Sequence, residues 1–103
     1  MTTRTIGELE EIVLLIIAIL HGEAYSVKII DEMDERLNRK VSLGAVQTVL
    51  KRLEKKELVQ SAFGNSTSTR GGKRKRQYKV TSVGLNLLER TRAQRNGLHE
   101  AIP

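Results

Sequence analysis

Residues 42–80, with the sequence SLGAVQTVLKRLEKKELVQSAFGNSTSTRGGKRKRQYKV, decide which fold the chain is expected to adopt. Ser42 is a residue type that caps helix N-termini, and apolar residues then recur at helical spacing to about Lys56. Two segments follow, LVQSAF and RQYKV, whose alternating apolar residues are typical of short strands. Between them, GNSTSTRGGKRK is polar, contains glycine and lacks carboxylates, which is typical of a long loop. The stretch therefore predicts a helix followed by a β-hairpin with a basic loop.

The predicted helix that begins at Ser42 has an apolar side and a polar side. Its core side is expected to hold Leu43, Val46, Leu50 and Leu53, flanked by Gln47 and Val49. The opposite side begins with small residues and ends in cations: Gly44, Thr48, Lys51, Arg52 and Lys55.

A first helix is predicted near the N-terminus. Thr5 and Glu8 have the spacing of a capping box, so the helix should begin there and stop near Gly22. Residues 12–20, IVLLIIAIL, are apolar on every side, and a helix of that kind is buried on every side. Because a few short helices cannot enclose one of their number, part of this surface is expected to meet another subunit.

Two further helices complete the pattern. One should extend from about Ser26 to Leu37, and its inner side is expected to hold Val27, Ile30, Met33 and Leu37. The last should be capped by Thr81 and reach about Asn96. Its apolar residues lie on two sides, with Val83, Leu87 and Leu98 on one and Leu85 and Leu88 on the other.

The order of the predicted elements is helix, helix, helix, strand, basic loop, strand, helix. This is the arrangement of a winged helix-turn-helix with one added C-terminal helix. We therefore predict a mainly α fold with a small β-hairpin wing. Residues 1–80 would form the winged helix-turn-helix, and residues 81–103 would form a C-terminal dimerisation helix and tail within one compact unit.

The charge of the chain is distributed unevenly. The net charge is +6, yet residues 1–40 carry five Lys/Arg and eight Asp/Glu, whereas residues 41–103 carry thirteen and four. No carboxylate occurs between Leu58 and Leu88. This asymmetry points to a polyanionic partner, either a nucleic acid or an anionic membrane surface.

Other patterns argue against an enzyme and against a membrane segment. His21 and His99 stand alone, and no nucleophile–base pair or metal-ligand spacing occurs, so we expect neither catalysis nor a cofactor nor a metal. Gly72-Lys73 does not complete a phosphate-binding loop, because Thr67 stands where that motif needs glycine. Residues 12–20 are too few to cross a bilayer, and glutamates rather than cations precede them. With no cysteine in the chain, a cytoplasmic protein is expected.

Three non-enzymatic alternatives remain beside a DNA-binding protein. An RNA-binding module is disfavoured because the chain has only three aromatic residues on which bases could stack. A membrane-surface module is disfavoured because the cations cluster in a loop rather than on an amphipathic helix. A winged-helix protein-interaction module without specific DNA binding stays open, and the salt dependence of duplex binding distinguishes it.

Four segments resemble the PadR-type transcriptional regulators: residues 6–10, 24–26, 42–59 and 70–84. The most specific feature is RGG, a basic run and Y-x-V-T-x-x-G, joined to L-K-R-L-E-x-K at residues 50–56. The resemblance implies a homodimeric winged-helix repressor of nearby promoters, with the dimer built from the N- and C-terminal helices. The chain departs from the family pattern in two places. Many members have tyrosine where this chain has Gln47, and many have a longer region than the one that follows Leu98 here.

The predicted DNA contacts combine this resemblance with the charge pattern. The helix that begins at Ser42 would enter the major groove, and the cations of the loop would neutralise phosphates while Gly71 and Gly72 let the backbone approach them. The predicted contact residues are Tyr25, Ser26, Ser42, Gly44, Ala45, Gln47, Thr48, Lys51, Arg52, Lys55, Arg70, Gly71, Gly72, Lys73, Arg74, Lys75 and Arg76.

The apolar excess of the first and last helices predicts a two-fold dimer. The expected partners are double-stranded DNA with a palindromic operator, a second copy of the chain and an apolar small-molecule effector at the dimer seam, without a membrane. The predicted dimer-interface residues are Leu9, Ile12, Val13, Ile16, Leu87, Leu88, Thr91 and Leu98.

Overall fold

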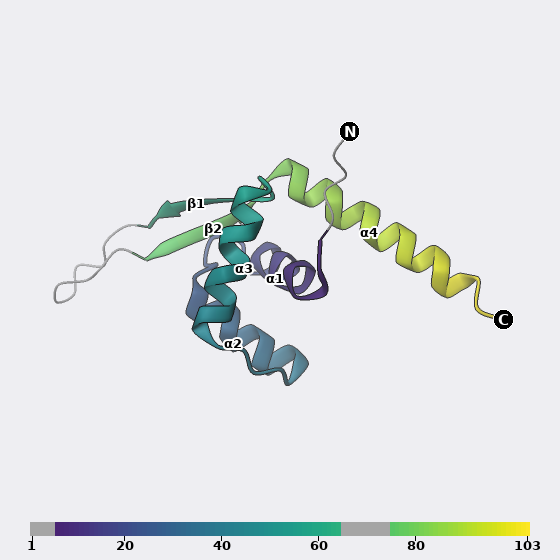
Figure 1. Ribbon diagram of the computed structural model, residues 1–103, viewed down its shortest axis with the longest axis horizontal. Coiled ribbons are helices and arrows are strands. Elements are labelled where there is room, and N and C mark those ends of the chain that lie inside the picture. Colours follow the sequence, from purple (N-terminus) through teal and green to yellow (C-terminus); the bar gives the residue numbers. More distant parts are fainter. Residues whose placement is uncertain (1–5, 65–74) are drawn as a thin grey trace.

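The computed structural model describes residues 6–64 and 75–103, and its elements follow the predicted order (Figure 1). In chain order they are α1 Glu8–Ile19, α2 Ser26–Leu37, α3 Leu43–Lys55, β1 Val59–Phe63, β2 Arg76–Val80 and α4 Ser82–Glu100. The two strands pair antiparallel, with Val59 opposite Val80 and Phe63 opposite Arg76. The predicted winged helix-turn-helix with a C-terminal helix is therefore confirmed as the fold class.

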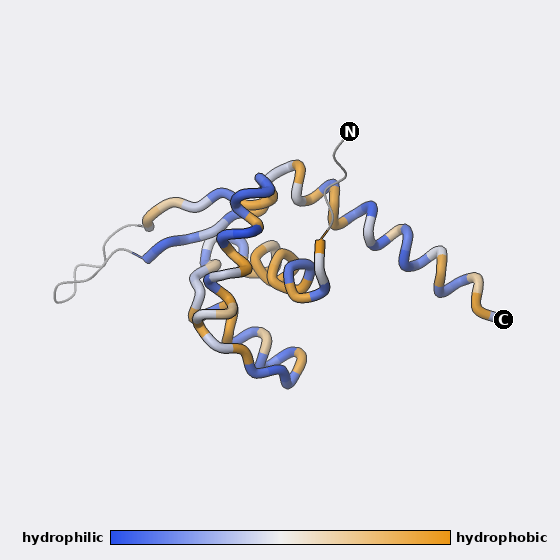
Figure 2. Tube along the Cα trace, in the orientation of Figure 1, coloured by the Kyte–Doolittle hydropathy of each residue, from blue (hydrophilic) through white to orange (hydrophobic). Residues whose placement is uncertain are grey.

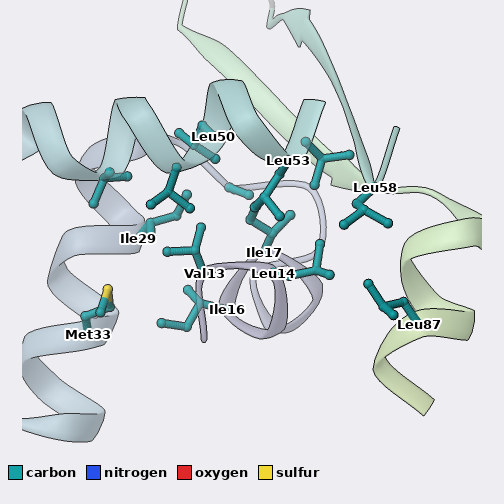
Figure 3. Packing of buried hydrophobic residues seen from close by; sticks show 14 residues of the cluster. Val13, Leu14, Ile16, Ile17, Ile29, Met33, Leu50, Leu53, Leu58 and Leu87 are labelled. Carbon is teal, nitrogen blue, oxygen red and sulfur yellow. The ribbon is translucent and has the colours of Figure 1, made fainter. Parts of the chain in front are cut away.

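Helix α1 lies at the centre of the core, between α2, α3, the start of the hairpin and α4 (Figure 1). Ile17 points toward Leu53 of α3, and Leu14 points toward the side from which Leu87 of α4 approaches the same cluster (Figure 3). The single chain does not bury α1 on every side, as expected for so few helices, because Leu15 and Ile19 are about half exposed. No neighbouring element of the described chain covers that side of α1, so the two residues stay at the surface.

The N-cap of α1 lies two residues further along the chain than predicted, and only the glutamate half of the expected capping box forms. The N-cap is Gly7, whose backbone N–H donates to Glu10 Oε1 at 2.8 Å, and Thr5 lies outside the described residues. The helix ends at Ile19, and Gly22 with a φ of 93° lies in the turn beyond it. A left-handed φ of that kind favours glycine, which explains why the chain reverses there.

The predicted core sides of α2 and α3 are wrong at three residues: Val27, Leu37 and Leu43. In α2 the buried residues are Ile29 and Met33, one helical turn apart, whereas Val27 lies well away from their side and is exposed. Leu37 is exposed because it ends the helix, beyond the elements that cover Ile29 and Met33. In α3 Val49 joins Val46, Leu50 and Leu53 in the core, and Leu43, at the first turn, is exposed instead.

The predicted caps of the later helices are confirmed. Ser42 Oγ accepts a hydrogen bond from the Ala45 N–H at 3.1 Å, and Thr81 Oγ1 accepts one from the Gly84 N–H at 3.0 Å. Thr81 Oγ1 also donates to the Glu57 carbonyl at 2.8 Å, so one hydroxyl both caps α4 and joins it to the turn before β1. Helix α4 continues to Glu100, further than the predicted end at Asn96.

The fold explains why the T-x-x-G part of the sequence signature ends in glycine, at Gly84. A methyl group at this position would meet the Leu58 carbonyl oxygen and lie 2.7 Å from Val80 Cγ1. Only glycine lets α4 start so close to the strands, and this close approach aims the rest of α4 away from the hairpin (Figure 1).

Glu10 joins α1 to α3 through an ion pair. Its carboxylate lies 2.9 Å from Lys56 Nζ and is largely buried. Burial raises the pKa of Glu10, but the Gly7 N–H and Lys56 lower it by more, so the pKa lies below its ordinary value. The ionised carboxylate therefore stabilises the fold above the ordinary glutamate pKa, and the contribution is lost as the pH falls through the lowered one.

Glu10→Gln is expected to lower the free energy of unfolding by about 2 kcal/mol near pH 7, because Lys56 loses a charge-assisted hydrogen bond. Thermal unfolding at a series of pH values measures this. The difference from the original chain should shrink below pH 4.5, the ordinary value for the group. Glu8→Gln, which breaks an exposed pair with Arg39, is the control and should change stability little. A loss that persists unchanged at acid pH would contradict the assigned role.

Candidate nucleic-acid interface

An open concavity lies between the N-terminal part of α2, the outward side of α3 and the first residues of β2. Six of the predicted DNA contacts border it: Tyr25, Ser26, Gln47, Lys51, Lys75 and Arg76. They come from three separate stretches of sequence that only the fold brings together. Figure 1 shows α2, α3 and the hairpin on the same part of the molecule, away from the C-terminal half of α4.

The outward side of α3 is exposed as predicted. Its predicted members all lie at the surface: Gly44, Thr48, Lys51, Arg52 and Lys55. Gln47, which was expected to flank the core side, is exposed too, and no atom crowds Gly44. Thr48 Oγ1 donates to the Gly44 carbonyl at 2.9 Å, which fixes its hydroxyl against the helix. The major groove of a duplex could therefore approach the first turns of α3 closely, and its phosphates could meet cations further along the helix.

Six predicted contacts of α3 and its N-cap do not border the concavity: Ser42, Gly44, Ala45, Thr48, Arg52 and Lys55. Ser42 is exposed, but its hydroxyl oxygen accepts the capping hydrogen bond from Ala45, which is itself partly buried. Arg52 is exposed on the side of α3 that faces α1, where its charge contributes to the lowered pKa of Glu10. Arg52 therefore borders the Glu10–Lys56 pair rather than the concavity.

Arg76 is held in place at the start of β2. Its guanidinium lies 4.9 Å from the ring centroid of Phe63, and Nη1 donates to Ser61 Oγ at 3.4 Å. Ser61 Oγ in turn donates to Glu54 Oε2 of α3 at 2.6 Å. These contacts restrict the rotamers of Arg76 while leaving it exposed, so its charge faces solvent from a defined position.

Tyr25 fastens the start of α2 to β2. Its hydroxyl oxygen accepts a hydrogen bond from Gln77 Nε2 at 2.7 Å, and Lys75 Nζ lies 5.2 Å from its ring centroid. A backbone hydrogen bond from the Tyr78 N–H to the Ala24 carbonyl, 3.0 Å long, reinforces the same junction. Burial also raises the pKa of Tyr78, so this phenol is neutral at the base of the hairpin. The direction of the hairpin relative to α3 therefore depends on Tyr25.

A family model described as the transcriptional regulator PadR-like family matches residues 13–90, which include α2, α3, both strands and most of α1. The chain belongs to this family.

Known relatives of this PadR-like regulator agree in sequence and in fold. An uncharacterized protein from Lysinibacillus sphaericus is 35% identical over 80 residues, which cover 76% of this chain and 69% of that protein. The crystal structure of a PadR-like transcription factor from Bacteroides fragilis superposes with a TM-score of 0.75 at 30% identity, over 89% of this chain and 84% of that one. The fold is also shared with Bacillus subtilis PadR in complex with operator DNA, with a TM-score of 0.66 at 18% identity, over 79% of this chain and 45% of that one.

Carboxylates that the sequence did not assign to the site also border the concavity of this PadR-like regulator: Glu23, Asp31 and Glu54. Glu54 accepts the hydrogen bond from Ser61, and Glu23 lies 3.8 Å from Lys28. Glu23 and Asp31 lie on the α2 side together with one cation, Lys28. The other three cations lie on the side of α3 and β2. A polyanion would accordingly lie toward Lys51, Lys75 and Arg76.

The predicted glycines and cations of the loop, Arg70, Gly71, Gly72, Lys73 and Arg74, lie outside the described residues. Within residues 6–64 and 75–103, no group of three histidine, cysteine or acidic side chains is placed to hold a metal ion. No helix in the same part of the chain is long and apolar enough to span a bilayer.

The predicted dimer-interface residues fall into three groups. Val13, Ile16 and Leu87 belong to the core of the single chain and have almost no surface left for a partner. Partly buried positions are Leu9, Ile12, Leu88 and Thr91. Leu98 is 72% exposed, and Leu15 and Ile19, which the sequence prediction did not include, expose an apolar edge of α1. The sequence indicated an apolar excess, but only the fold shows which residues carry it.

Tyr25→Phe is expected to weaken duplex binding about fivefold without unfolding the PadR-like regulator, because the hairpin loses one hydrogen bond that orients it. Fluorescence anisotropy with a labelled duplex measures the affinity. Gln77→Met should have a similar effect, and the double variant should be no weaker than either single one, because both remove the same bond. Additive losses would show that Tyr25 acts on DNA independently of Gln77.

Proposed function

We propose that this protein is a sequence-specific DNA-binding transcriptional regulator, which acts as a dimeric repressor of nearby genes in the cytoplasm. The observation that carries the proposal is the concavity in which Gln47 and Lys51 of α3 lie together with Lys75 and Arg76 at the start of β2. A winged helix-turn-helix uses this helix in the major groove, and the Bacillus subtilis structure of the same fold contains operator DNA.

Within this function the residues divide between selection and affinity. Gln47 and the small residues Gly44 and Thr48 belong to the turns of α3 that would face base edges, and a glutamine amide pairs with adenine through two hydrogen bonds. Lys51, Lys75 and Arg76 would neutralise phosphates, which contributes affinity without selecting sequence.

The dimer supplies symmetry and reach. Leu98 on α4, and Leu15 and Ile19 on α1, are apolar and exposed in the single chain, and a second copy would cover them. A two-fold pair presents two α3 helices to a palindrome whose half-sites lie about 10 base pairs apart. Such a dimer represses simply by covering promoter DNA, and the apolar seam between its subunits would accept an apolar effector.

Selection of duplexes from a randomised library with the purified protein tests the proposed function. We expect enrichment of one palindromic sequence, and affinity for it should fall steeply as the salt concentration rises. A protein that enriches no sequence and binds duplexes without salt dependence would instead be the winged-helix protein-interaction module.

Gln47→Ala is expected to relax the preference at one or two positions in each half-site, with a loss of discrimination of about 1–3 kcal/mol. Competition binding between the selected duplex and single-base variants of it measures the preference. Gln60→Ala, which changes an exposed glutamine of β1 outside the concavity, is the matched control and should leave the preference unchanged. An unaltered preferred sequence would place Gln47 beside the interface rather than in it.

A further inference from the structure

Two apolar side chains interrupt the polar surface of the concavity. Val27 of α2 is 63% exposed and Leu43 of α3 is 45% exposed, and both border the concavity together with Gln47. Their helical positions suggest core residues, yet α2 and α3 supply other side chains to the core: Ile29, Met33, Val46, Val49, Leu50 and Leu53.

Val27 and Leu43 differ from ordinary exposed apolar residues because both border the same concavity. A single exposed leucine, such as Leu37 at the end of α2, needs no explanation. Val27 and Leu43 come from different helices but border one concavity, and Gln47, one helical turn after Leu43 on α3, borders it as well. An apolar contact in a concavity that also holds the cations Lys51, Lys75 and Arg76 suits a polyanion that itself carries an apolar group.

Duplex DNA has such a group in the major groove. The 5-methyl group of thymine is the apolar feature of the base edges there, and the paired adenine offers the acceptor and donor that a glutamine amide matches. Valine and leucine have no hydrogen-bonding atoms in their side chains, so a methyl group is the part of a base edge that they can recognise favourably. We infer that Val27 and Leu43 form a contact for a thymine 5-methyl group beside Gln47, so that each half-site contains an A·T pair at this position.

The inference rests on the proposed function and extends it to one base pair of the operator. An apolar small molecule or a partner protein would also contact valine and leucine, but neither accounts for Lys51, Lys75 and Arg76 around the same concavity. The carboxylates Glu23 and Asp31 on the α2 side do not exclude DNA, because phosphates would lie toward α3 and β2.

Replacement of thymine by uracil tests the inference, because it removes the 5-methyl group and leaves all hydrogen-bonding atoms in place. The probe is the palindrome enriched from the randomised library, with each thymine replaced in turn. At one or two positions per half-site the affinity should fall about fourfold, the factor that corresponds to the burial of one methyl group. Val27→Ala and Leu43→Ala should bind the thymine and uracil duplexes equally at those positions.

Two matched variants make this experiment specific. Leu37→Ala shortens an exposed leucine outside the concavity and should keep the full sensitivity to uracil. Val27→Thr keeps the side-chain shape, replaces one methyl group by a hydroxyl and should lose much of the sensitivity, even if Leu43→Ala proves too unstable to study. A preferred duplex whose uracil forms all bind equally, or sensitivity that persists in both alanine variants, would overturn the inference alone. Failure to enrich any duplex would overturn the proposed function as well.

Discussion

Replacing Lys51, Lys75 and Arg76 together with alanine is expected to weaken binding to the selected duplex by about 10²–10³-fold in 0.1 M salt. The three cations border the same concavity, and all of them are exposed to an approaching phosphate backbone. Each phosphate contact contributes about 0.9 to the slope of log affinity against log salt, so the slope should fall by about 2.7 in magnitude. Binding to unrelated duplexes should weaken by a similar factor, because phosphates carry no sequence information.

A second triple variant separates the position of the cations from the total charge of the chain. Lys79, Arg90 and Arg92 are also exposed, but they lie on β2 and α4 outside the concavity. Their replacement with alanine removes the same charge and should change the salt slope far less. Titrations of both variants over about one decade of salt concentration, from about 0.05 to about 0.5 M, show whether the position of the cations or the total charge determines binding. Equal slopes for the two variants would show that net charge, rather than this concavity, binds the duplex.

The sequence predicted those parts of the fold whose signals are local. Ser42 and Thr81 cap helices through bonds to residues three positions later, so a short window of sequence contains the whole interaction. The strands flank a segment of polar sequence, and their paired residues, such as Val59 and Val80, lie in segments with an apolar alternation. These signals place α3 and the hairpin, and they therefore place the main part of the candidate site.

Contacts between distant segments could not be predicted in the same way. The hydrogen bond from Gln77 to Tyr25 and the ion pair between Lys56 and Glu10 depend on packing of elements far apart in the chain. Val27 and Leu43 were assigned to the core because they are apolar, but burial depends on which neighbouring element covers each side of a helix. The departure from the predicted core is also what reveals the apolar contact beside Gln47.

In α4, too, the burial of each side chain depends on which elements lie beside it. Leu87, Thr91 and Leu98 follow one side of α4 at helical spacing. Leu87 is buried in the core, Thr91 is partly buried and Leu98 is 72% exposed, because α4 extends past the rest of the protein (Figure 2). The Glu11–Arg95 ion pair, 2.8 Å long, holds the middle of α4 beside α1. A second copy of α4, related by a two-fold axis, would cover the outer part of this stripe.

Leu98→Glu is accordingly expected to convert the proposed dimer into a monomer and to weaken binding to the full palindrome by about 10²–10⁴-fold, the gain that linkage of two binding sites normally provides. In a two-fold seam the new carboxylate would be buried against an apolar surface and close to its own copy, so both desolvation and repulsion oppose association. Asn96→Glu is the matched control, because it adds the same charge to an exposed position on the opposite side of α4 and should leave the dimer intact.

Sedimentation velocity at micromolar concentration, together with titration of full and half palindromes, measures both consequences. The original chain and Asn96→Glu should sediment as dimers and prefer the full palindrome strongly. Leu98→Glu should sediment as a folded monomer that binds full and half palindromes with similar, weak affinity, because each α3 then binds alone. An original chain that is monomeric at this concentration and binds a half palindrome as tightly as the full one would contradict the dimer. The exposed end of the Leu87–Leu98 stripe would then need a different partner to cover it.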